Sequence, residues 1–167
     1  RHVALQPSTF RLLLNPDGTA TAELAMTDIG TGTYTILTQI AADLLGLSPG
    51  QVTVRLGDTD YPDAPGSGGS FGANSSGSAL YAASEALKAN LAARLDVDPA
   101  LARFDNGALV AGDMSKTFAA LTKDGPIEVV GDFRPGDLAK QYSQQSYGAH
   151  FCEVAVDRDT GETRVRR

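Results

Sequence analysis

Two glycine-rich turns, each followed by a helical pattern, are the segments of this chain whose residue types and spacing could do chemistry. The first turn, Asp28-Ile-Gly-Thr-Gly-Thr, leads into residues 33–45, and the second lies within residues 66–77, which hold five glycines and four serines. Turns of this kind expose backbone N–H groups at the positive end of a helix, where anions bind. Residues 28–87 contain one basic residue, Arg55. Main-chain amides and hydroxyls must therefore hold any anion bound there.

The second turn, residues 66–77, is open to three interpretations. It could be a flexible linker between domains, a structural turn, or a loop that cradles an anion or a cofactor. We favour the cradle, because the turn lies between a strand pattern and the strongest helical pattern in the chain. Its glycines would let the backbone approach a ligand closely, and the hydroxyls of Ser67 and Ser70 could donate hydrogen bonds. The first turn lacks the third glycine of a dinucleotide fingerprint and the Gly-Lys-Ser/Thr of a P-loop.

Other reactive side chains give weaker signals. Asp58, Asp60 and Asp63 could form a metal cluster, but their spacing does not match the calcium loop, and a solvated acidic turn is the better interpretation. His150 and Cys152 share one parity of a strand pattern, which predicts a structural histidine and a buried, inert thiol. Neither histidine has a nucleophile partner that the sequence would place beside it. The sequence therefore predicts no catalytic residue and no metal ligand.

Hydrophobic periodicity predicts an α+β fold, with a mixed or antiparallel sheet, several hairpins and two main packed helices. Residues 19–27 alternate as a strand with one buried face, paired in a hairpin with residues 10–14. A short helix is predicted from Ser115 to about Asp124. The remaining predicted elements are helices at 33–45 and 74–95, a hairpin at 103–110, strands at 52–56, 127–130 and 146–156, and a returning strand at 162–165.

Size and charge narrow the class of protein. The 167 residues suit a single unit, or two small lobes at residues 1–95 and 96–167. A net charge of -6 argues against nucleic acid as a partner, and the absence of a long apolar run argues against membrane insertion. The single cysteine leaves periplasm and cytoplasm open. Because the chain starts without Met and stops after a hairpin pattern, we interpret it as a piece of a larger protein, whose exposed surfaces would allow self-association.

Several motifs together resemble the large, molybdenum-binding subunit of the xanthine dehydrogenase and aldehyde oxidase family, the molybdenum hydroxylases. The resemblance runs from about residue 20 onward and is weak over residues 96–140. The motifs that carry it are Asp28-Ile-Gly-Thr-Gly-Thr-Tyr-Thr with Gln39, Gly57-Asp-Thr, Gly68-Gly-Ser-Phe-Gly-Ala-Asn with Gly77, and Tyr147-Gly-Ala-His-Phe-Cys-Glu-Val-Ala-Val-Asp with Thr160-Gly-Glu.

The resemblance implies a molybdopterin-binding-domain-like fold in which both loops grip the cofactor. That cofactor would be molybdopterin dinucleotide, in its cytosine form, with molybdenum. The implied cofactor-binding residues are Gly30, Thr31, Gly32 and Thr33 of the first loop and Gly68, Gly69, Ser70, Phe71 and Gly72 of the second.

The resemblance also implies an activity and partners. Members of the family hydroxylate aldehydes or N-heterocycles with oxygen from water, and pass the electrons to an iron–sulfur subunit and an FAD subunit. The family's catalytic glutamate lies beyond the point where this chain ends, so we do not expect the isolated chain to be active. The alternative hypothesis is a non-enzymatic binding or interaction module in which both glycine loops are structural turns.

Overall fold

The computed structural model describes residues 6–137, 141 and 148–167. Its main sheet has four strands in the order β3-β2-β1-β7. Strand β1 (Ser8–Leu14) pairs antiparallel with β2 (Ala20–Leu24) and with β7 (Ile127–Phe133), whereas β3 (Val52–Leu56) runs parallel to β2. A parallel neighbour requires a crossover connection, and helix α1 (Thr33–Leu45) lies within that connection. The sheet is therefore mixed, as predicted.

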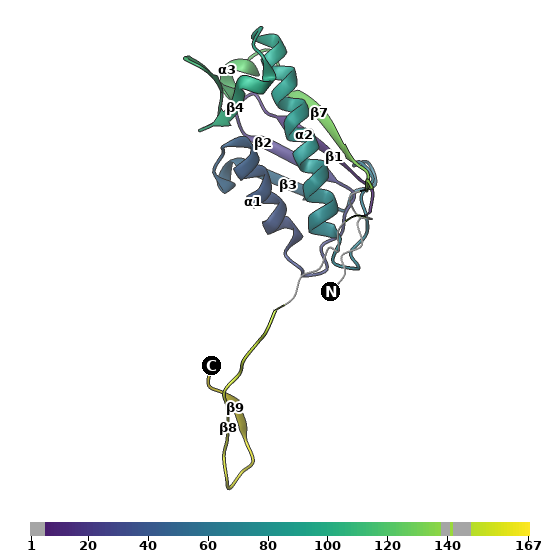
Figure 1. The fold of residues 1–167 in the computed structure, drawn as a ribbon, viewed down its shortest axis with the longest axis vertical. Helices are drawn as coiled ribbons and strands as arrows, with labels where there is room; N and C mark the ends of the chain where they lie inside the picture. Colours follow the sequence, from purple (N-terminus) through teal and green to yellow (C-terminus); the bar gives the residue numbers. More distant parts are fainter. Residues whose placement is uncertain (1–5, 138–140, 142–147) are drawn as a thin grey trace.

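Two long helices cover one face of this sheet. Helix α2 (Gly72–Arg94) packs against β1 and β7, and α1 lies beside it against β3 (Figure 1). The core between the layers is built from side chains such as Leu12, Leu37 and Leu87, each fully buried. Hydrophobic burial between one helical layer and one sheet defines the α+β class and confirms the predicted fold.

Smaller elements flank this body. A three-stranded antiparallel sheet is formed by β4 (Ala102–Asp105), β5 (Ala108–Ala111) and β6 (Met114–Thr117), followed by α3 (Phe118–Leu121). Positive φ angles at Asn106 and Gly107 make the β4–β5 connection the tight hairpin that Asp105-Asn-Gly predicts. Short 3-10 helices η1 (Pro49–Gln51) and η2 (Pro99–Leu101) precede β3 and β4. A hairpin of β8 (Val154–Val156) and β9 (Thr163–Val165) stands apart from the body in Figure 1.

Two sequence predictions, one for β2 and one for Ser115, are wrong. Strand β2 was expected to bury one face, but all five of its residues are buried, because neighbouring strands flank it and Glu23 is held by arginines on the face opposite the helices. Ser115 does not begin a helix: it lies in β6, and the helix N-cap is Thr117, whose hydroxyl accepts from the amide of Ala120. Pairing with β5 outweighs the local capping preference of the serine.

The strand predicted at 146–156 is also mostly wrong. Residues 146 and 147 lie outside the described part of the chain, and residues 148–153 form no strand. His150 and Cys152 are exposed, so neither is the buried residue that strand parity predicted. Strand β8 pairs with β9 in a two-stranded sheet, and among the described residues no second layer buries one of its faces.

A buried carboxylate joins three strands on the sheet face opposite the helices. Glu23 of β2 is 5% exposed, and its oxygens lie 2.6 Å from Arg11 Nη2 of β1 and 3.2 Å from Arg55 Nη1 of β3. The Arg11 guanidinium also lies over the Tyr61 ring, 5.7 Å from its centroid. Burial is tolerated here because the carboxylate has a charged partner on each side.

Glu23→Ala is expected to lower the free energy of unfolding of the chain by about 2 kcal/mol, between the values typical of exposed and of buried ion pairs. The loss arises because Arg11 is left half-buried without its counter-charge. Urea denaturation measures it. The matched control is Glu85→Ala, which removes a partly exposed i,i+3 pair with Lys88 and should change stability by less than about 0.5 kcal/mol. Equal effects of the two substitutions would contradict the structural role of Glu23.

Candidate cofactor site

The first glycine loop is organised around the carboxylate of Asp28. Its Oδ1 accepts hydrogen bonds from the amides of Gly30 at 2.8 Å and Thr31 at 2.9 Å, and its Oδ2 accepts from the amide of Tyr34 at 3.3 Å. Gly30 and Gly32 have φ angles of 90° and 81°, which L side chains rarely adopt. Helix α1 therefore begins with an internal anion on its first turn.

The charge of Asp28 is stabilised by these contacts. Desolvation raises the pKa of the carboxyl, but backbone N–H groups of Tyr34, Gly30, Thr31 and Gly32 lower it, and the net pKa lies below the ordinary value of 3.8. A carboxyl group with a lowered pKa stays ionised, and keeps accepting these bonds, as the pH falls towards its unfolded pKa. The loop contact is lost only as the pH falls further, through the folded pKa.

The second loop, residues 66–72, turns tightly into α2. The amide of Phe71 donates to the carbonyl of Gly68, while Gly69 and Ser70 both have left-handed φ angles, 52° and 60°. A Cβ added at Gly69 would lie 2.6 Å from Cδ1 of the Phe71 ring, which folds back over the loop. Neither long helix has an N-cap side-chain bond or an acidic residue within its first turn. On α1 the Tyr34 amide is bonded to Asp28, which precedes the helix, whereas in the described residues no side chain is bonded to the first-turn amides of helix α2. Its first amides therefore lack an intrahelical acceptor.

The two loops are tied to each other. The Ser67 hydroxyl donates to the carbonyl of Thr27, immediately before the first loop. Met26, two residues after the end of β2, packs under the start of α2: its Sδ lies 3.5 Å from the Ser76 hydroxyl, and a Cβ at Gly72 would meet its Cε at 2.2 Å. Segments some forty residues apart in sequence are thus fixed side by side.

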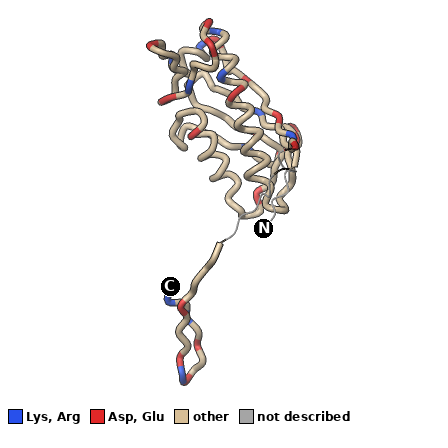
Figure 2. The backbone as a smooth tube through the Cα atoms, in the orientation of Figure 1, with Lys and Arg blue, Asp and Glu red and all other residues tan. Residues whose placement is uncertain are grey.

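Together the loops enclose a cleft of about 400 Å³. None of the described residues that line it is charged, and the ends of α1 and α2 that carry the loops are largely free of Lys, Arg, Asp and Glu (Figure 2). Its lining combines hydroxyls with apolar side chains. The lining residues are Met26, Ile29, Thr31, Thr33, Ile36, Ser67, Gly68, Gly69, Ser70, Gly72 and Ala73.

Six of the nine site residues expected from sequence line this cleft: Thr31, Thr33, Gly68, Gly69, Ser70 and Gly72. The other three do not line the cleft but set the conformation of the loops: Gly30 and Gly32 supply left-handed turns, and Phe71 packs against Gly69. Sequence reasoning missed the apolar contribution of Met26, Ile29 and Ile36 to the cleft. The sequence held one signal: an isoleucine stands at position 29, directly beside the glycines of a turn. In the structure Ile29 is 70% exposed.

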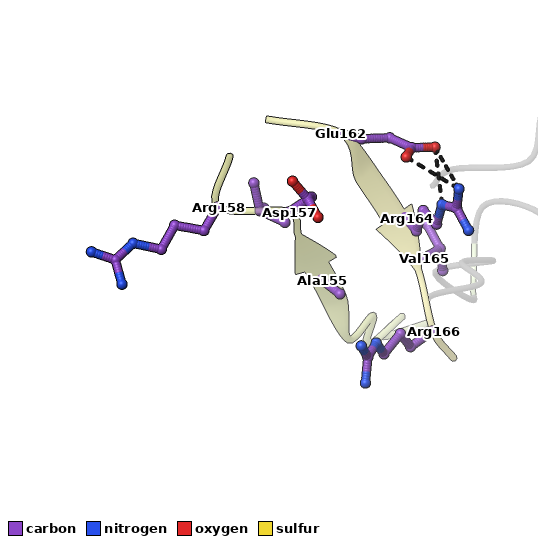
Figure 3. Close-up of a pocket in the computed structure, with 8 residues that line it drawn as sticks. Ala155, Asp157, Arg158, Glu162, Arg164, Val165 and Arg166 are labelled. Carbon is purple, nitrogen blue, oxygen red and sulfur yellow. Dashed lines mark hydrogen bonds and ion pairs between the residues drawn. The ribbon is translucent and has the colours of Figure 1, made fainter. Parts of the chain in front are cut away.

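The remaining candidates do not converge. Asp58, Asp60 and Asp63 are exposed, and no group of three or more His, Cys, Asp or Glu side chains in the described residues could hold a metal ion. A second hollow, on the β8–β9 hairpin, is lined by Arg158, Arg164 and Arg166 (Figure 3). Arg164 there pairs with Glu162, and Arg158 and Arg166 point away from one another. No described helix is long and apolar enough to cross a membrane.

The architecture defines an α+β domain that presents two glycine-rich loops, one at the start of each long helix, to a single uncharged cleft. The chain matches the molybdopterin cofactor-binding domain family over residues 2–167 and belongs to that family. The predicted family is therefore confirmed, and membership favours cofactor binding over the interaction module.

Named relatives agree with this membership. The chain is 43% identical over 167 residues to the aldehyde oxidoreductase molybdenum-binding subunit PaoC of Escherichia coli (strain K12), covering 100% of this chain and 23% of PaoC. It is 33% identical to the probable hypoxanthine oxidase XdhD of the same strain, covering 91% of this chain and 17% of XdhD. The chain thus spans about a quarter or less of the curated relatives it matches.

Solved structures show the same fold. The chain superposes on reconstituted CO dehydrogenase from Oligotropha carboxidovorans with a TM-score of 0.68 and 24% identity, covering 96% of this chain and 22% of that one. At that identity the likeness concerns the fold alone.

The cleft fits a pterin cofactor on its own geometry. Its volume lies within the range of about 300–1,000 Å³ typical of small-molecule sites. Apolar side chains of Met26, Ile29 and Ile36 can lie against a ring system, while the hydroxyls of Thr31, Thr33 and Ser70 can bond to its heteroatoms. A fused, hydrogen-bonding heterocycle with an anionic tail needs both kinds of group.

Proposed function

We propose that this cleft binds the pterin portion of molybdopterin dinucleotide, in its cytosine form, within the molybdenum-binding subunit of an oxidoreductase. The reaction would be hydroxylation of an aldehyde or N-heterocycle with oxygen from water. The observation that carries the proposal is the meeting of two distant glycine-rich loops on one uncharged cleft. The 43% identity to PaoC, which is named as an aldehyde oxidoreductase subunit, supports the aldehyde class.

The chain's own part in this reaction would be binding and orientation. The second loop and the first turn of α2 would donate backbone N–H groups, and Thr31 and Thr33 would donate hydroxyls from the first loop. Ile29 and Ile36 would exclude water from the ring faces. When bound, the cofactor supplies the molybdenum redox chemistry. No residue of this chain is assigned a catalytic role.

We further propose that residues 1–167 act as one cofactor-binding unit and that an iron–sulfur subunit and an FAD subunit complete the enzyme. The relatives of this chain include the carbon monoxide dehydrogenase large chain of Hydrogenophaga pseudoflava, whose name is that of one subunit of a larger assembly. Co-expression of the complete subunit with its gene neighbours, followed by affinity purification, tests the partners. Recovery of the molybdenum-binding subunit alone at physiological salt would contradict them.

The test of cofactor binding is molybdenum, pterin and released nucleotide per purified chain of the complete subunit. We expect about one of each, with cytidine monophosphate as the nucleotide. Preparations free of molybdenum and pterin, from a host that makes the cofactor, would contradict the proposal and favour the interaction module. A different nucleotide would contradict only the cytosine form.

Ser70→Ala is expected to weaken cofactor retention by about 1–3 kcal/mol, the range for one hydrogen bond to a charged or buried polar group. The side chain is exposed at the mouth of the cleft, so the fold should not change. The rate of pterin release from the complete subunit measures the effect. Ser78→Ala, on the part of α2 beyond the cleft, is the control and should release pterin at the wild-type rate. Equal release from Ser70→Ala and wild type would remove Ser70 from the site.

A further inference from the structure

The two helix starts at the cleft are electrostatically different. On α1, the amide of Tyr34 in the first turn is already bonded to Asp28, together with the amides of Gly30 and Thr31 just before it. On α2, the first turn has no acidic residue and no side-chain cap. An anion arriving at the cleft therefore meets a negative charge behind the first loop and unneutralised amides at the second.

Asp28 also sets the position of the hydroxyls that reach the cleft. Its Oδ1 lies 3.5 Å from Thr31 Oγ1, which in turn lies 3.3 Å from Thr33 Oγ1. Thr31 and Thr33 line the cleft, whereas Asp28 does not. A chain of contacts thus leads from a carboxylate behind the loop to two hydroxyls in front of it.

We propose that Asp28 is a positioning residue of the cofactor site. It accepts hydrogen bonds from the amides of the first loop, so that these amides are not free for the ligand, and it orients the Thr31 and Thr33 hydroxyls toward the cleft. The anionic part of the cofactor is then directed to the second loop and α2, and the first loop meets the neutral part. This inference rests on the proposed function. It replaces the expectation that both glycine loops offer their amides to the ligand.

Three variants of the complete subunit test it. Asp28→Ala removes the carboxylate, Asp28→Asn keeps one acceptor oxygen, and Asp157→Ala is the control. Asp157 accepts from the amides of Asp159 and Thr160 and from the Thr160 hydroxyl in a similar turn, on the distant β8–β9 hairpin. For each variant we would measure the rate of pterin release and the hydrogen exchange of the loop amides by mass spectrometry.

Asp28→Ala is expected to release pterin about tenfold faster than wild type. Its amide hydrogens over residues 29–34 should also exchange faster, because the charge-assisted hydrogen bonds from these amides to Asp28 are lost. Asp28→Asn should lie between the alanine variant and wild type, and Asp157→Ala should match wild type. Sodium formate should slow release from Asp28→Ala, since its carboxylate can occupy the vacated amides. Sodium chloride at equal ionic strength should not.

Unchanged release and unchanged exchange in Asp28→Ala would overturn the inference and leave the proposed function standing. Faster release that formate does not slow would also overturn it, because a loss of general stability predicts no rescue by a carboxylate. A wild-type subunit without cofactor would instead overturn the proposed function. In that sample, loop exchange that does not differ between wild type and Asp28→Ala would overturn the role of Asp28 as well.

Discussion

Gly69→Val is expected to reduce molybdenum and pterin in the complete subunit to below about a tenth of the wild-type content. The φ of 52° at this residue disfavours any L side chain, at a cost of about 1–2 kcal/mol. A Cβ there would also lie 2.6 Å from the Phe71 ring, and the β-branch of valine adds to the clash. The loop is exposed, so it can move away from the ring without unfolding the domain. Moving it displaces the amides that face the cleft.

The matched control for this prediction is Gly112→Val. Gly112 has almost the same φ, 55°, and lies in the turn between β5 and β6 with no atom within 4 Å of an added Cβ. It should therefore impose the same backbone strain without the clash, while molybdenum and pterin stay near the wild-type content. Wild-type cofactor content in Gly69→Val would contradict the assignment of the second loop to the cofactor.

The two long helices could be predicted because their signals in the sequence were local. Gly46 follows the last apolar residue of α1 and ends the helix in the left-handed conformation, as its position in the sequence indicates. The small residues of α2 likewise predict a helix that lies close to the sheet, and the structure begins it at Gly72, at the end of the second loop. Local composition was sufficient for each of these features.

Features that depend on distant partners could not be predicted. The carboxylate of Asp28 was visible in the sequence, but its three amide partners follow from the left-handed turns at Gly30 and Gly32. Strand β2 has an alternating pattern, yet it is buried throughout because of the arginines of β1 and β3. Hydrophobic periodicity describes the residues of one segment, and it does not show which other segments pack against them.

Cys152 and His150 show the opposite error: their alternating pattern predicted burial, and the structure leaves both residues exposed. Their alternating pattern is the one that a half-buried strand produces, but the strand begins at Val154, beyond both residues. An alternating sequence buries one face when a second layer lies against it, and the β8–β9 ribbon has no such layer in the described residues. The cleft residues Met26 and Ile36 were missed for a related reason, since an apolar residue beside a helix start is more often part of the core.

Gly131→Ala is expected to lower the free energy of unfolding of the chain by at least about 3 kcal/mol, at the upper end of overpacking effects. Gly131 lies in β7 where α2 crosses the sheet, and a Cβ there would meet the Ala83 nitrogen at 2.1 Å and the Ala79 carbonyl oxygen at 2.3 Å. Both are backbone atoms, so no rotamer change can relieve the contact. The whole helix would have to move away from β7 and β1, which would open the core that the helix covers.

Urea denaturation of the chain measures this effect, with Gly136→Ala as the control. Gly136 follows five residues later, has no atom within 4 Å of an added Cβ, and has no positive φ. Because neither glycine has a positive φ, the two substitutions reduce the entropy of the unfolded chain alike, and the difference between them isolates the contact with α2. Stability losses within about 0.5 kcal/mol of each other, the usual range for a surface substitution, would contradict the close approach of helix and strand. A large difference would show that a single missing methyl group sets the distance between the two layers that carry the cofactor loops.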